Sequence, residues 1–178
     1  MTGSATSGDG LSSAEIATLA GQLRRLVGDG LGVPNLPFVV LEALRGLTSV
    51  PVVELCVLDD DGAVLLIWRD DVHWRGWHFP GGFMAPWESI AQACARVGQR
   101  ELGAVFTLQG VVGVEGWADH PYASPVSLLC RGVLDRPPAE GRFFPSPPED
   151  LIKEQRTYFA SIRADRGIVV DRARTSPL

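Results

Sequence analysis

The chain has 178 residues, of which 46% are hydrophobic and 21% are charged, as expected for one globular domain rather than a disordered, fibrous or coiled-coil protein. The 16 basic and 21 acidic residues give a net charge of −5 and form no basic tract, so nucleic acid is not expected as a partner. The longest purely apolar run, residues 63–68, is too short to span a bilayer, so no membrane contact is expected.

The cysteines and the N-terminus indicate a reducing compartment. Cys56, Cys94 and Cys130 are widely spaced and odd in number, which fits neither a disulfide framework nor a zinc site. Residues 1–10 are small and polar, without the charged start and apolar stretch of a signal peptide. We therefore expect a cytoplasmic protein.

Two helices are predicted near the N-terminus, after a disordered arm over residues 1–10. Ser12 and Glu15 have the spacing of a capping box, and apolar residues at helical spacing follow until Gly28. A second, short helix is predicted over residues 36–45. Both helices precede the part of the chain that carries the chemistry, as a lid or a dimer contact would.

Extended segments follow the two helices. Apolar residues alternate over 53–57, and a continuous apolar run fills 63–68. The acidic and glycine residues at 59–62 form a turn between them, and we predict a hairpin.

A strand over 77–79 is predicted to lead into a turn at residues 80–82 and then into a helix over 87–102. Two more strands are predicted over 105–115 and 126–134.

The C-terminal part of the chain contains a proline-rich segment over 135–150, which we predict to be a long loop without regular structure. A last helix is predicted over 149–163, with apolar residues on one side. The tail after Gly167 is weakly determined by its sequence.

One segment in the middle of the chain carries a recognisable spacing. Gly82 is followed after five residues by Glu88, and after seven more by Arg96, with Glu101 and Gly103 completing the pattern. This segment resembles the box of the Nudix hydrolases. A tight glycine turn lets the backbone approach a diphosphate, and the helix after it presents carboxylates to a hard cation.

The resemblance implies an α/β fold, a Nudix-type α/β/α sandwich around a mixed β-sheet with an N-terminal helical extension. The chain then divides into an N-terminal arm and helical extension (1–46), a Nudix domain (47–165) and a C-terminal tail (166–178).

The box departs from the family pattern at two positions. Most of the family has three helix glutamates around the metal ions, whereas this chain has Val97, Arg100 and Glu101 at those positions. One carboxylate can hold one magnesium ion, with the remaining charge balanced by the substrate diphosphate. A multi-metal attack on phosphorus is therefore not expected.

This pattern of losses is similar to that of the GDP-mannose mannosyl hydrolases, as are Trp77 and the segment 156–159, within a resemblance that spans about residues 47–164. These enzymes are understood to cleave the sugar C–O bond with one magnesium ion. The resemblance therefore implies Mg²⁺ as cofactor, a nucleotide-type small molecule as substrate and a homodimer. It implies Glu101 and the Gly81 carbonyl as metal ligands.

A loop after the strand that follows the box supplies a base in that subgroup, and here the matching loop contains Asp119 and His120. His120 is the candidate general base, because imidazole titrates near neutrality. Asp119, in the place of a metal-binding glutamine, would complete the metal shell. The alternative is that His120 simply ends a strand.

Several arginines complete the predicted site. Arg69, Arg96 and Arg100 are expected around the diphosphate. Arg96, by the family pattern, is a catalytic residue that orients the neighbouring acid, or it is a plain surface residue, and Arg69 falls near a substrate-binding arginine of the subgroup. The subgroup places an arginine directly after the two glycines, whereas this chain has Phe83, which we predict to line the substrate site. Arg100 either replaces that arginine at the diphosphate or repels magnesium from Glu101.

Two further residues have alternative roles. Glu88 is expected to hold the junction between loop and helix or to belong to an outer metal shell. Trp74 belongs to a group of four tryptophans within residues 68–87 and is predicted to lie in a loop. Its ring would stack on a nucleobase or sugar, or it would pack in the rim of the core.

These features predict a Mg²⁺-dependent hydrolase of a nucleoside diphosphate sugar, in which water attacks the anomeric carbon. One alternative is a pyrophosphohydrolase that acts on a nucleoside diphosphate or another phosphorylated metabolite. The other is a ligand-binding or regulatory protein without catalysis.

Overall fold

The computed structural model describes residues 11–29, 35–117, 120–121 and 123–164. The helices are α1 (Ser13–Gly28), α2 (Phe38–Leu44), α3 (Ile90–Leu102) and α4 (Arg156–Arg163), and a 3-10 turn at Lys153–Gln155 precedes α4. The strands are β1 (Val50–Val57), β2 (Val64–Asp70), β3 (Arg75–His78), β4 (Gly81–Phe83), β5 (Phe106–Gly116), β6 (Pro125–Leu134) and β7 (Arg142–Phe144). The predicted arm over 1–10, Asp119 and the tail after Gly167 lie outside the described residues.

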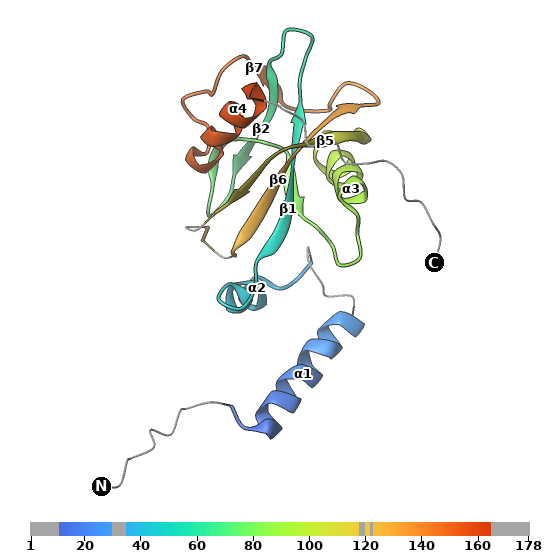
Figure 1. Ribbon diagram of the computed structural model, residues 1–178, viewed down its shortest axis with the longest axis vertical. Coiled ribbons are helices and arrows are strands. Elements are labelled where there is room, and N and C mark those ends of the chain that lie inside the picture. Colours follow the sequence, from blue (N-terminus) through green and yellow to red (C-terminus); the bar gives the residue numbers. More distant parts are fainter. Residues whose placement is uncertain (1–10, 30–34, 118–119, 122, 165–178) are drawn as a thin grey trace, which may run out of the picture.

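The strands form two sheets, shown in Figure 1. One has the order β4-β1-β6-β5, in which β1 and β6 run parallel and the other neighbours antiparallel. The other has the order β3-β2-β7 and is antiparallel throughout. The predicted mixed sheet is therefore confirmed.

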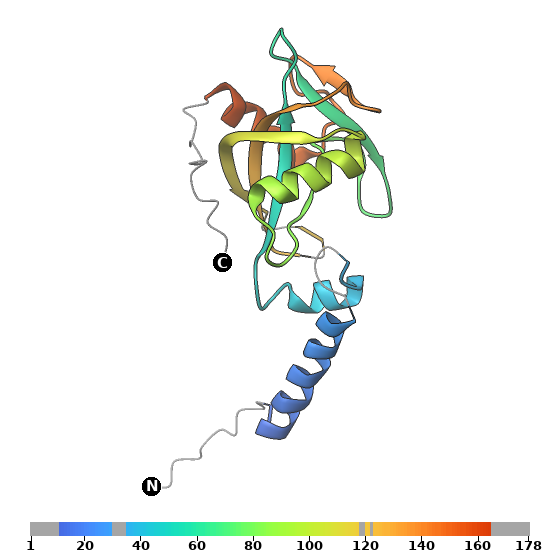
Figure 2. The same cartoon turned by 90° about the vertical axis from the view of Figure 1, so that its right-hand side faces the viewer.

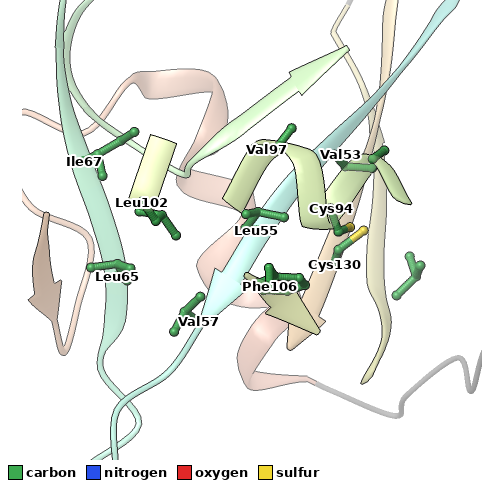
Figure 3. Close-up of a cluster of buried hydrophobic side chains, with 12 residues drawn as sticks. Val53, Leu55, Val57, Leu65, Ile67, Cys94, Val97, Leu102, Phe106 and Cys130 are labelled. Carbon is green, nitrogen blue, oxygen red and sulfur yellow. The ribbon is translucent and has the colours of Figure 1, made fainter. Parts of the chain in front are cut away.

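Helices cover the sheets on two opposite faces, as Figures 1 and 2 show for α3 and α4. Successive side chains of β1 alternate between the faces: Leu55 packs with α3 residues, whereas Cys56 packs with Tyr158 and Phe159 of α4. Figure 3 shows the α3 side of this core, with Val97 above Leu55. The α/β/α sandwich predicted from the sequence is thus the observed architecture.

The helix α3 begins and ends at local signals in its sequence. Ser89 caps its first turn in a capping box with Gln92, and Gly103 ends it with the positive φ of 63° that glycine tolerates. The predicted start at residue 87 is wrong by three residues. Trp87 is instead fully exposed with a φ of 66°, outside the helical region.

The N-terminal helix α1 lies apart from the sheets. The capping box of Ser12 and Glu15 is present, so α1 begins where the sequence predicts. Figures 1 and 2 both show α1 away from the sheets, and its apolar Ile16 and Leu19 remain exposed. None of the described helices is long and apolar enough to cross a membrane.

The predicted hairpin of the first two strands is wrong. β1 and β2 share only the isolated bridge between Leu58 and Val64, and each strand pairs with other partners in its own sheet. Both strands are largely buried, so each can be enclosed between neighbours, and the apolar pattern does not determine which neighbours these are.

Three other predicted elements are corrected. Gly81 and Gly82 belong to strand β4, which pairs with β1, and are not only a turn. The segment 135–150 contains strand β7, which the prolines bracket without interrupting. The last helix begins at Arg156 rather than at residue 149, because the chain first makes a 3-10 turn.

Candidate functional site

Two adjoining hollows lie where β1, β2, β4 and the end of α3 meet. The inner cavity measures about 90 Å³ and is lined by Glu54, Trp74 and His120, among others. The outer cleft measures about 420 Å³ and is lined by Arg100 and Glu101, among others. Of these two, the outer cleft has the size of a typical ligand pocket.

The predicted site residues gather around these hollows. His120 and Trp74 line the inner cavity, and Arg100 and Glu101 line the outer cleft. The residues common to both are Arg69, His78, Gly81 and Phe83. Segments far apart in the sequence therefore meet at one place. Their catalytic and binding roles stay predictions.

Arg96 lines neither the inner cavity nor the outer cleft. Its guanidinium makes two hydrogen bonds to Glu88, each of 2.8 Å, and donates a third, also of 2.8 Å, to the Phe83 carbonyl. The hydrogen bonds from Arg96 hold the pKa of the Glu88 carboxyl below its usual range. Glu88 also accepts the Ala85 N–H, so the pair holds the junction between β4 and α3, which is the first of the two alternatives given for Glu88.

The carboxylate of Glu101 is engaged by protein groups on both oxygens. Oε2 accepts the Gly81 N–H at 3.0 Å, and Oε1 accepts a hydrogen bond from Arg100 Nη2 at 2.5 Å. The same Nη2 donates to the Gly81 carbonyl at 3.0 Å. Arg100 therefore lies between the two described groups that the resemblance assigns to magnesium.

The described residues, in this arrangement, do not fit a magnesium site. Magnesium needs several oxygen ligands in near-octahedral geometry, whereas Glu101 and the Gly81 carbonyl hold a guanidinium. Within the described part of the chain, no group of three or more His, Cys, Asp or Glu side chains could hold a metal ion. The use of magnesium by this chain stays a prediction.

His120 lies against two indole rings in the wall of the inner cavity. The ring centroids of Trp74 and Trp117 lie 5.8 and 5.6 Å from that of His120. Burial and the nearby positive charges of Arg45 and Arg69 lower the pKa of His120 to about 4. The imidazole is therefore neutral at pH 7, the state in which it can accept a proton.

The loop between β2 and β3 orients Trp74 and Arg69. Asp71 accepts hydrogen bonds from the backbone N–H groups of His73 and Trp74 and from Nε of Arg69. This carboxylate closes the loop and places an indole and a guanidinium on the same cavity. Trp74 lies in a loop, as predicted, and its contact with His120 keeps it half-buried.

Glu54 also lines the inner cavity and was not predicted from the sequence as a site residue. Glu54 lies on β1 with 5% of its surface exposed, and burial, together with the charge of Glu101, raises the pKa of its carboxyl. A side-chain hydrogen bond joins it to Gln155, which accepts the backbone N–H of Phe79 at 2.8 Å. One acidic residue within an apolar strand was the available signal.

Trp117 was also missed, although it follows a predicted strand. Its Nε1 donates a 2.8 Å hydrogen bond to the Tyr158 hydroxyl, which links the His120 wall to α4. No local pattern distinguishes it from the other tryptophans, because its partner lies far away in the sequence.

Comparison with known proteins agrees with this architecture. A family model described as the NUDIX domain matches residues 48–158, more than half of the chain. No curated protein matches the chain.

Several solved structures share the fold at low sequence identity. The E. coli ORF135 protein is 22% identical with a TM-score of 0.56, over 67% of this chain and 91% of that chain. A MutT NUDIX hydrolase from Burkholderia pseudomallei is 17% identical with a TM-score of 0.55, over 65% of this chain and 97% of that chain. A MutT protein from Methanosarcina mazei Go1 is 18% identical with a TM-score of 0.54, over 65% of this chain and 94% of that chain.

Proposed function

The chain belongs to the NUDIX domain family, and from this membership we propose that it is a hydrolase of a nucleoside diphosphate sugar. In this proposal water attacks the anomeric carbon and the nucleoside diphosphate leaves. The observation that carries the proposal is that His120 and the Gly81–Gly82 segment of the box line one cavity. The proposal therefore assigns a base and a diphosphate-binding segment to the same site.

The diphosphate is proposed to bind in the outer cleft. Arg69 and Arg100 line that cleft from β2 and α3, and guanidinium groups match phosphate oxygens in geometry and charge. Gly81 and Phe83 form the wall that the cleft shares with the inner cavity. The sugar then reaches the inner cavity, where His120 and Trp74 lie.

His120 is proposed to act as the general base. Its neutral imidazole takes a proton from water while the water oxygen bonds to the anomeric carbon. The bond between that carbon and the diphosphate oxygen breaks, and the oxygen leaves with the bonding electrons. Arg69 and Arg100 would stabilise the negative charge that develops on the leaving diphosphate.

The low pKa of His120 in the free protein is compatible with this role. Burial lowers that pKa, and Arg45 and Arg69 lower it further. A bound diphosphate brings negative charge to Arg69 and offsets its effect, so binding raises the pKa of the base toward working pH.

A panel of nucleoside diphosphate sugars, incubated with and without magnesium in oxygen-18 water, tests the proposal. Label in the released sugar is the expected result, because the water oxygen bonds to carbon. Label in the phosphate would instead indicate the pyrophosphohydrolase alternative. No turnover of any substrate would contradict hydrolysis and favour a ligand-binding protein.

We also propose that the chain divides into an N-terminal arm and helical extension (1–46), a Nudix domain (47–165) and a C-terminal tail (166–178).

We further propose the homodimer that the resemblance implies. Exposed apolar side chains on α1, such as Ile16 and Leu19, support a contact through the N-terminal extension. Light scattering of the full chain should give twice the monomer mass. Replacing Leu19 by Glu should shift that mass toward the monomer, and a monomeric wild type would contradict the proposal.

A further inference from the structure

The end of α3 carries a cation at the place where the family resemblance predicts a metal ion. We propose that the Arg100 guanidinium is the built-in cation of the outer cleft and that this cleft binds a diphosphate group without a metal ion. The inference rests on the proposed function only in taking a diphosphate as the ligand. It concerns how the charge of that ligand is balanced.

The contacts of Arg100 are those of a bridging cation. One nitrogen, Nη2, lies 2.5 Å from Glu101 Oε1 and 3.0 Å from the Gly81 carbonyl oxygen. The second oxygen of Glu101 accepts the Gly81 N–H. A metal ion could use these oxygens only after Arg100 had left, which would give up two hydrogen bonds, one of them to a carboxylate.

Strand β4, which lies against α3, has room for the guanidinium because residue 82 is glycine. A Cβ at position 82 would lie 2.8 Å from Arg100 Nη2 and 3.4 Å from the Val97 side chain. Val97 itself is fully buried in the core. Residues 97, 100 and 101 lie on one helix face and supply, in that order, an apolar side chain, a guanidinium and a carboxylate.

The guanidinium still has donors for a ligand. Arginine has five N–H donors, and both described hydrogen bonds of Arg100 use Nη2, which leaves those of Nε and Nη1. The Arg100 side chain is 46% exposed, whereas that of Glu101 is 19% exposed. Arg100 can therefore contact Glu101 and a phosphate oxygen at the same time, as a metal ion would.

Binding of two probes to the full chain tests whether the Arg100 guanidinium or a metal ion balances the charge of a bound diphosphate. Calorimetry measures the affinity for inorganic pyrophosphate in EDTA and in magnesium, and electron paramagnetic resonance measures binding of Mn²⁺. The variants are Arg100→Gln, which removes the charge, Arg100→Lys, which keeps it, and Arg100→Gln combined with Glu101→Gln. Arg136→Gln is the matched control, because Arg136 also pairs with the adjacent acid, Asp135, at an exposed site.

The wild type should bind pyrophosphate equally well in EDTA and in magnesium. Arg100→Gln should weaken binding in EDTA by about 10- to 100-fold, the loss expected for a charge-assisted contact, and Arg100→Lys should restore part of it. Mn²⁺ should bind Arg100→Gln at least about tenfold more tightly than the wild type, because the Glu101 and Gly81 oxygens are released. The double variant should lose that gain, and Arg136→Gln should behave as the wild type.

Two results would overturn the inference. One is tight Mn²⁺ binding by the wild type, with pyrophosphate bound only in the presence of metal. The other is no pyrophosphate binding under either condition. These outcomes are separate from turnover: metal-free binding without hydrolysis would contradict only the proposed function, and hydrolysis that requires metal would contradict only the role of Arg100.

Discussion

Two walls enclose the inner cavity and the outer cleft, and different kinds of contact hold each wall in place. The box wall, formed by Gly81–Phe83 and α3, is held by hydrogen bonds of charged groups, such as those from Arg96 and Arg100. The loop wall, formed by Trp74, Trp117 and His120, combines contacts between these rings with hydrogen bonds to distant residues such as Tyr158.

The difference lies in how far apart the partners are in the sequence. The box wall comes from one continuous segment, so fixed spacings between glycine and charged residues describe it. The loop wall combines two segments, the β2–β3 loop and the residues after β5, and depends on the end of α2, because Arg45, directly after that helix, donates a hydrogen bond to the Pro121 carbonyl. Contacts of this kind leave no local pattern. The box wall is therefore expected to govern stability and ligand binding, and the loop wall turnover.

The largest effect is expected from His120→Gln in the loop wall. If His120 removes the proton from water, the substitution should lower kcat by roughly two to four orders of magnitude. KM should change little, because Arg69 and Arg100 remain. The measurement is steady-state turnover of the nucleoside diphosphate sugar identified by the panel.

His73→Gln is the matched control for this prediction. His73 stacks on Phe38 with ring centroids 5.2 Å apart and does not line the inner cavity. Its substitution should leave kcat within a few-fold of the wild type. Equal rates for His120→Gln and the wild type would remove His120 from the mechanism and assign the loop wall to packing alone.

The sequence could predict the box wall better than the loop wall. The spacing of five residues, from Gly82 to Gly103, was sufficient to identify the segment that lies at the outer cleft. Glu54 was not predicted as a site residue, because the pairing of β1 with β4 is what places it opposite Gly81. Strand pairing of this kind joins distant residues, and the apolar pattern that predicts a strand does not name its partner. The incorrect hairpin of β1 and β2 has the same cause.

An intermediate effect, on stability, is expected from Arg96→Gln in the box wall. The substitution removes three hydrogen bonds of a partly buried guanidinium and should lower the free energy of unfolding by about 1–3 kcal/mol. Urea denaturation at pH 7 measures this change. Arg136→Gln, at an exposed ion pair, should have no measurable effect.

The effect of Arg96→Gln should depend on pH. The hydrogen bonds from Arg96 lower the pKa of Glu88 in the folded state, so the stabilisation is present above the unfolded pKa of about 4.3. It is lost as the pH falls through the folded pKa, because Glu88 becomes protonated. The difference between variant and wild type should therefore shrink at low pH. A constant difference would assign it to the Phe83 hydrogen bond instead.

The smallest effect is expected from Arg45→Gln, which links the N-terminal extension to the loop wall. Arg45 donates from Nη1 to the Pro121 carbonyl at 3.1 Å, and its own carbonyl accepts from Ser124 at 2.8 Å. Loss of the first bond should loosen the backbone next to His120 and lower kcat by about 3- to 10-fold. Steady-state kinetics measure this change, and Arg45→Lys should restore part of the rate.

A second readout separates positioning from general loss of stability. Burial is the main cause of the low pKa of His120, and the positive charge of Arg45 lowers it further, so Arg45→Gln should raise that pKa above about 4. Nuclear magnetic resonance of the imidazole measures the pKa, with Arg24→Gln on α1 as the control. An unchanged kcat and pKa would mean that the ring contacts with Trp74 and Trp117 hold the loop wall without α2. The N-terminal extension would then have no part in the site.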